Sequence, residues 1–311
     1  MYRQDTRYEQ APPPRRRRRR LGKAKRAEVV LGTALAAGVI IAVGVMAWTS
    51  VKGIPSESLT PSSSTPTHSQ APVAVAVAPP SDWKLKFNSA FSGSTLDTKV
   101  WATCYYWSLS GGCTNSGNNG EEREWYLPSQ DQVRGGVLNL VAQHQPTEGT
   151  AANGEPKTYT CRSGMVTTMP SVNFKYGFVQ MVARVPYGNG LWPAFWLAAS
   201  DKKWPPEVDV FEHWASEADV GVYLHPTDGI RQGGRATADG NLSKGWHTFT
   251  LLWTKTSLKW YIDGHQVLST KTAIPQQDMY IVANVADTST AANSCSGTML
   301  IKSVKVWQPA A

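Results

Sequence analysis

The chain has 311 residues, with 31 Lys and Arg against 23 Asp and Glu, and a formal net charge of +8. The surplus lies entirely in residues 1–80, which carry 12 basic and 4 acidic side chains, whereas residues 81–311 carry 19 of each. A folded domain without net positive charge lacks the electrostatic signature of a nucleic-acid binder, so we expect no nucleic-acid partner.

The N-terminal portion predicts export. Residues 1–28 form a basic tail, and residues 29–48 form an apolar stretch in which Thr33 is the only polar side chain. Twenty helical residues span about 30 Å, the thickness of a bilayer core, and the preceding arginines favour a cytoplasmic N-terminus. We expect a single-pass signal-anchor that places the remainder outside the cell membrane. The alternative is a cleaved signal peptide and a secreted product, with a cleavage site at Val45-Met46-Ala47.

Residues 49–80 are rich in Ser, Thr and Pro and predict an extended linker. Residues 81–311 hold 12 of the 13 tryptophans and alternate short β-prone runs with turn residues. The clearest runs are Gly136–Ala142, Phe178–Arg184, Thr248–Trp253, Leu258–Ile262 and Met299–Val306. Asp263-Gly264 after one of these runs predicts a hairpin. We therefore expect one all-β domain, a sandwich, barrel or jelly roll.

Three acids lie close together in an otherwise apolar run, Glu207-Val-Asp209-Val-Phe-Glu212. Strand alternation places Glu207 and Asp209 on one face, and a one-residue bulge at Val210–Phe211 would bring Glu212 to the same face. Retaining glycoside hydrolysis needs one ionised carboxylate and one protonated carboxyl group in this arrangement. A solvated acidic strand face or a calcium site would show the same pattern. His213, by alternation, should face away from the acids.

Trp192 and Trp196 precede the acids and share one face of a predicted strand. Because sugar rings stack on indole, a pair of tryptophans beside three acids favours a sugar-binding surface over two ordinary core residues.

Several motifs together resemble glycoside hydrolase family 16, and most closely its laminarinase-like branch with the motif E-x-D-x-x-E. They are Lys175-Tyr-Gly-Phe-Val-Gln-Met, Gly190-Leu-Trp-Pro-Ala-Phe-Trp, Glu207-Val-Asp-Val-Phe-Glu, Gly245-Trp-His-Thr-Phe, Trp260-Tyr-Ile-Asp-Gly and Met299–Trp307. The resemblance covers residues 83–308 and implies a β-jelly-roll sandwich of two curved antiparallel sheets, preceded here by the transmembrane helix, with a cleft across the concave face.

The resemblance also implies roles for individual residues. Glu207 matches the nucleophile, Glu212 the acid/base and Asp209 a helper that tunes the nucleophile. The positions that match the lining of the cleft are Trp192, Trp196 and Asn284. His225 either borders a sugar subsite or is an ordinary strand histidine.

Two departures from the family pattern affect substrate and metal. The segment after Asn284 runs to Cys295 without the Gly-Gly loop of many relatives, which leaves the linkage preference open. Lys302 stands where relatives often carry a calcium-binding Asp, so we expect no cofactor and no structural calcium.

The expected activity is retaining, endo-acting hydrolysis of a β-linked polysaccharide, with β-1,3-glucan or mixed β-1,3/1,4-glucan preferred, by a monomeric catalytic domain. The alternatives are hydrolysis or transglycosylation of another β-polysaccharide such as a galactan, and a non-catalytic sugar-binding jelly roll.

The four cysteines form no C-x-x-C pair, which argues against a zinc site and favours disulfides in an exported domain. We expect the pairs Cys104–Cys113 and, by elimination, Cys161–Cys295, although the sequence leaves the other two pairings open.

Overall fold

A computed structural model describes residues 77–106, 113–115, 122–151, 153–169, 171–188, 190–214, 216–288 and 295–310. The basic tail, the apolar stretch 29–48 and nearly all of the linker lie outside these residues. Among the described residues, none belongs to a helix of the length and apolarity that crossing a membrane requires.

The described residues form sixteen strands and one short 3-10 helix, η1. The strands are β1 (Trp83–Ser89), β2 (Glu124–Tyr126), β3 (Asp131–Arg134), β4 (Val137–Thr150), β5 (Pro156–Ser163), β6 (Met165–Thr167), β7 (Gly177–Arg184), β8 (Leu191–Ala199), β9 (Glu207–Glu212), β10 (Asp219–His225), β11 (Gln232–Thr237), β12 (His247–Trp253), β13 (Leu258–Ile262), β14 (His265–Thr270), β15 (Met279–Asp287) and β16 (Ser296–Pro309), with η1 at Pro128–Gln130.

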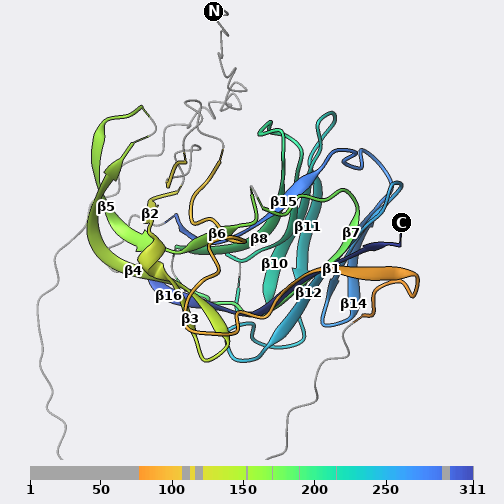
Figure 1. The fold of residues 1–311 in the computed structure, drawn as a ribbon, viewed down its shortest axis with the longest axis horizontal. Coiled ribbons are helices and arrows are strands. Elements are labelled where there is room, and N and C mark those ends of the chain that lie inside the picture. The colour runs from red at the N-terminus through yellow and green to blue at the C-terminus, as the bar shows by residue number, and fades with distance from the viewer. Residues whose placement is uncertain are drawn as a thin grey trace, which may run out of the picture. The chain divides into compact units, whose positions relative to one another are not determined.

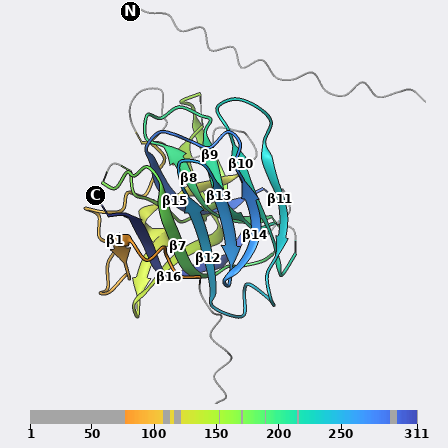
Figure 2. The ribbon, with the colours of Figure 1, turned by 90° about the vertical axis from the view of Figure 1, so that its right-hand side faces the viewer.

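Two sheets carry these strands (Figure 1). The larger has ten strands in the order β14-β13-β12-β7-β16-β4-β5-β2, with β1 on β16 and β3 on β4; Figure 2 shows β7, β12, β13 and β14 side by side. The smaller has six strands in the order β11-β10-β9-β8-β15-β6. All pairings are antiparallel except that of β2 with β5.

Alternate side chains of each strand build the core between the sheets. In the six-stranded sheet, Val208 and Val210 of β9 and Phe195 and Leu197 of β8 join one large buried cluster with residues of the other sheet. Side chains at the intervening positions therefore lie on the opposite, outer face of the six-stranded sheet. The three acids of β9 belong to that outer face.

The structure confirms the all-β sandwich and the five strands expected from the sequence. Asp263 and Gly264 both have positive φ and connect β13 to β14 as a hairpin, because left-handed conformations at both positions are what a two-residue turn of this kind requires. Disulfides Cys104–Cys113 and Cys161–Cys295 are also present as expected.

Candidate active site

A bulge in β9 places the three acids on one face of the sheet. Asp209 pairs with Tyr223 of β10 and Glu212 pairs with Gly221, so three steps along β9 match two steps along β10. The same shift occurs against β8. Val210 is the extra residue, and the predicted bulge is confirmed; without it, Glu212 would point into the core.

Rows of directly opposed residues run across the strands on the outer face. One row is Gly233, Tyr223, Asp209, Trp196 and Val282, from β11 to β15. A second row is Arg235, Gly221, Glu212, Ala194 and Asn284. A third is His225, Glu207, Ala198 and Tyr280. A sugar chain that crosses the strands along these rows meets all three acids.

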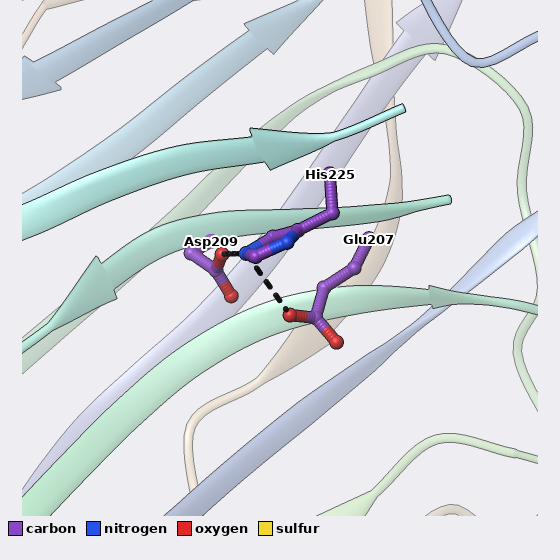
Figure 3. A group of neighbouring side chains, drawn as sticks. All are labelled: Glu207, Asp209 and His225. Atoms are coloured by element: carbon purple, nitrogen blue, oxygen red, sulfur yellow. Dashed lines mark ion pairs between the residues drawn. The ribbon is translucent and has the colours of Figure 1, made fainter. Parts of the chain in front are cut away.

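Polar side chains on neighbouring elements hold the acids. His225 Nε2 lies 3.4 Å from Asp209 Oδ2 and 3.7 Å from Glu207 Oε1, with its ring turned toward both carboxylates (Figure 3). Trp204 Nε1 donates to Glu207 Oε2 at 3.2 Å, and Trp192 Nε1 donates to Glu212 Oε1 at 3.0 Å. His225 thus contacts Glu207 and Asp209 directly, and its place beside a sugar subsite stays a prediction.

Burial raises the pKa of all three acids. Burial and then the charge of Asp209 raise the pKa of Glu207, and the same two causes raise the pKa of Glu212 to about 8. Burial raises the pKa of Asp209 to about 8, although the positive charge of Arg231 opposes the rise. Because ionising one acid hinders the next, the cluster retains protons at neutral pH and titrates as a unit.

The structure places the two tryptophans differently from one another. Trp192 is partly exposed and touches Glu212, whereas Trp196 is 9% exposed and its Nε1 donates to Asn284 Oδ1 at 2.8 Å. Asn284 is itself 3% exposed, and its Nδ2 donates to the hydroxyl of Tyr126 at 3.0 Å. Asn284 thus holds Trp196 and lies in the same outer-face row as Glu212, and the substrate contact that the resemblance implies for it stays a prediction.

The predicted orientation of His213 is confirmed. Its ring nitrogens lie 3.1 Å from the carbonyl oxygen of Pro186 and 2.6 Å from that of Ser216, so the ring contacts loop backbone and none of the three acids.

Comparison with known proteins decides the family. The model of glycosyl hydrolases family 16 matches residues 128–303, which include the three acids of β9 and the tryptophans that contact them. The chain belongs to glycosyl hydrolase family 16.

The chain is similar to the endo-1,3-1,4-beta-glycanases ExsH and EglC of Rhizobium meliloti, at 32% identity over 202 residues and 33% over 199. Each alignment covers 60% of this chain but only 42% of the relative, so the chain matches less than half the length of either protein. Among solved structures, the catalytic domain of an endo-1,3-beta-glucanase (laminarinase) from Thermotoga petrophila RKU-1 has a TM-score of 0.63 at 21% identity. It covers 74% of this chain and 99% of that domain. This likeness supports the family 16 jelly-roll fold.

A group of acids beside this family 16 site was not predicted from the sequence. Glu124 is fully buried, and its Oε2 accepts hydrogen bonds from the backbone N–H groups of Asp287 at 2.6 Å and Arg123 at 3.2 Å. Burial raises its pKa to about 7. Glu122 accepts from the hydroxyl of Tyr105 at 3.1 Å. The signal in the sequence that could have indicated this group is the pair of acids in Glu122-Arg-Glu-Trp-Tyr126, next to two aromatic residues.

An aromatic group on the other side of the acids was also missed. Trp214 is 44% exposed, and its ring stacks on Tyr223 at 6.1 Å between centroids with 13° between planes. Trp192 meets Trp214 edge-on at 5.9 Å. Trp204, 65% exposed, donates to Glu207 as described above. Exposed aromatics beside acids are the surface that sugar rings favour.

Proposed function

We propose that the chain is a retaining, endo-acting hydrolase of a β-linked glucan, with β-1,3-glucan or mixed β-1,3/1,4-glucan as substrate. The observation that carries this proposal is the bulge in β9, which brings Glu207, Asp209 and Glu212 to one face between tryptophans. Family membership and the names of the two Rhizobium meliloti relatives support the reaction and the substrate class.

In the first step, a carboxylate oxygen of Glu207 attacks the anomeric carbon and forms a covalent glycosyl ester. The bond from that carbon to the glycosidic oxygen breaks, and the oxygen takes a proton from Glu212. In the second step, Glu212 removes a proton from water, whose oxygen attacks the same carbon and releases Glu207. Two inversions leave the product in the β configuration.

The surroundings of the acids suit these roles. Glu207 receives a hydrogen bond from Trp204 and lies near His225, and both contacts favour its ionised form. The raised pKa of Glu212 keeps a proton on the group that must donate one. Burial raises the pKa of Asp209 to about 8, and a protonated Asp209 would leave a single negative charge on Glu207.

Incubation with laminarin tests the proposal. We expect reducing ends to appear with a rapid fall in polymer length, as an endo-acting enzyme produces, and the first products to be β anomers by NMR. Binding of laminarin without new reducing ends would instead identify a sugar-binding jelly roll. Disproportionation of oligosaccharides without net hydrolysis would identify a transglycosylase.

We further propose that residues 29–48 anchor the chain in the cell membrane, with the catalytic domain outside and the polysaccharide as its partner. The apolar length and the preceding arginines support this placement. Full-length protein should remain with membranes after carbonate extraction. A soluble product that begins near Trp48 would indicate cleavage of a signal peptide instead.

A further inference from the structure

Two arginines lie on the outer face of the six-stranded sheet, on the side of β10 and β11. The guanidinium of Arg231 lies 4.5 Å from the ring centroid of Tyr223, which directly neighbours Asp209. Arg235 stands opposite Gly221, which stands opposite Glu212. Both arginines are exposed.

Glycines let aromatic rings lie close to the sheet between these arginines and the acids. Gly221 lies between Arg235 and Glu212, and a Cβ there would collide with the rings of Tyr223 and Trp214, which cover the glycine. Gly233, at φ +127°, lies on the same face between the two arginines, and a Cβ there would approach the carbonyl oxygen of Val222 to 2.1 Å. The backbone therefore excludes any larger residue at Gly233, where a Cβ would also meet the ring of Tyr223 at 2.8 Å.

Within the described part of the chain, neither arginine forms an ion pair within 4 Å. The acid nearest Arg235 along the strands is Asp219, whose carboxylate accepts a hydrogen bond from Thr237 Oγ1 at 2.6 Å. Both guanidinium groups thus retain donors for an external acceptor, and a guanidinium binds carboxylate and sulfate oxygens in pairs.

Aromatic rings connect these cations to the reacting groups. Arg231 lies over Tyr223, Tyr223 stacks on Trp214, and Trp214 meets Trp192, whose Nε1 donates to Glu212. We call Arg231, Arg235, Trp214 and Tyr223 the arginine–aromatic surface. A sugar on this surface lies one or two sugar residues from the bond that is cleaved. One sugar residue covers the spacing of neighbouring strands, which is ~4.8 Å.

We propose that the arginine–aromatic surface binds an anionic substituent, a carboxylate or a sulfate, on a sugar residue of the substrate. The natural substrate is then an acidic β-glucan. This inference rests on the proposed glucan hydrolase activity and adds the chemistry of the substrate's side groups.

Three preparations of one β-1,3-glucan test the inference: the neutral parent, one oxidised at C6 to the carboxylate, and one sulfated at C6. The measurement is kcat/KM from reducing ends at low ionic strength. We expect at least one anionic preparation to be preferred by about tenfold, as one charged hydrogen-bonded contact provides. Added NaCl should reduce the preference because the surface is exposed.

The double variant R231Q/R235Q should lose most of the preference, measured as the ratio of anionic to neutral kcat/KM. Arg231→Lys should lose part of it, because lysine keeps the charge without the paired donors. Arg134→Gln is the matched control: Arg134 is exposed at the end of β3 in the other sheet, and its loss should leave the ratio unchanged.

The outcomes separate the two proposals. Preference for the carboxylated or the sulfated preparation supports the inference and identifies the group. Equal cleavage of all three by the wild type overturns it and leaves the glucanase activity standing. Equal losses on all three preparations in R231Q/R235Q would also overturn it. Failure to cleave any of them would refute the glucanase activity itself and, with it, the inference.

Discussion

The two sides of the site differ in how firmly their side chains are held. On the β8 and β15 side, Trp196, Asn284 and Tyr126 are at most 9% exposed and are joined by hydrogen bonds. On the β10 and β11 side, Trp214 is 44% exposed, and the contacts are ring stacking and an arginine over a ring. The first side is built like a core and fixes geometry, whereas the second is an open surface on which we propose that substrate binds.

The three acids of β9 lie between the two sides, and removal of either proposed catalytic glutamate should have the largest effect. Glu207→Ala and Glu212→Ala should each reduce turnover of polysaccharide by several orders of magnitude. On an activated aryl β-glycoside with azide, Glu212→Ala should give the β-glycosyl azide, because the covalent intermediate still forms. Glu207→Ala should give the α-glycosyl azide after a single inversion. Asp209→Asn should retain intermediate activity.

If both glutamate variants gave the same anomer, or kept near wild-type turnover of polysaccharide, the assignment of roles would be wrong.

The pH dependence of kcat/KM should report the protonation of Glu212. Its pKa of about 8 is raised by burial and by Asp209. Above that pH the protonated fraction falls about tenfold per unit, so kcat/KM on polysaccharide should decline likewise. An aryl glycoside whose leaving group needs no acid should lack this alkaline limb. A decline at the same pH for both substrates would assign the limb to another group.

Asn284→Ala tests the firmly held side. The substitution leaves Trp196 Nε1 and the hydroxyl of Tyr126 buried without their partner, at a cost of about 3 kcal/mol in unfolding free energy. Trp214→Ala is the matched substitution on the open side. It should alter KM and leave the free energy of unfolding, measured by chemical denaturation, nearly unchanged. Equal destabilisation by both variants would remove the distinction between the two sides.

Glu124→Gln should stabilise the protein at alkaline pH. Burial raises the pKa of Glu124 from 4.5 to about 7, so the folded state loses stability as pH rises from about 4.5 through 7. A shift of about 2.5 units corresponds to at most about 3 kcal/mol, fully expressed above pH 7. Chemical denaturation should show that Glu124→Gln has a higher free energy of unfolding than the wild type at pH 8 but not at pH 5.

Exposed Glu155 serves as the control, since Glu155→Gln should show no such gain. A Glu124→Gln variant that is less stable at both pH values would mean that the folded state needs the ionised carboxylate.

The smallest effect concerns calcium. The family resemblance places Lys302 where relatives often carry a calcium-binding Asp, and its Nζ lies 5.8 Å from the ring centroid of Trp246, so we expect EDTA to lower the melting temperature little. A fall of about ten degrees that calcium reverses would correspond to a few kcal/mol of ion binding and would contradict this.

The sequence predicted what depends on local periodicity. The bulge in β9, the shared face of Trp192 and Trp196, and the β13–β14 hairpin all follow from alternation over a few residues. The group around Glu124 was missed because β15 brings Asp287 to it from 163 positions away. Likewise, the neighbours of Arg231 depend on the register of β11 against β10, which no local pattern specifies.

The disulfide Cys104–Cys113 has a practical consequence for making the protein. Cys104 directly precedes Tyr105, and Cys113 directly precedes Thr114. The backbones of Tyr105 and Thr114 exchange hydrogen bonds at 2.8 and 2.9 Å, and the ring centroids of Tyr105 and Trp196 lie 6.3 Å apart. A host whose cytoplasm is reducing would leave both this disulfide and Cys161–Cys295 unformed. Expression in an oxidising compartment therefore preserves the covalent support of Tyr105 and its packing against Trp196.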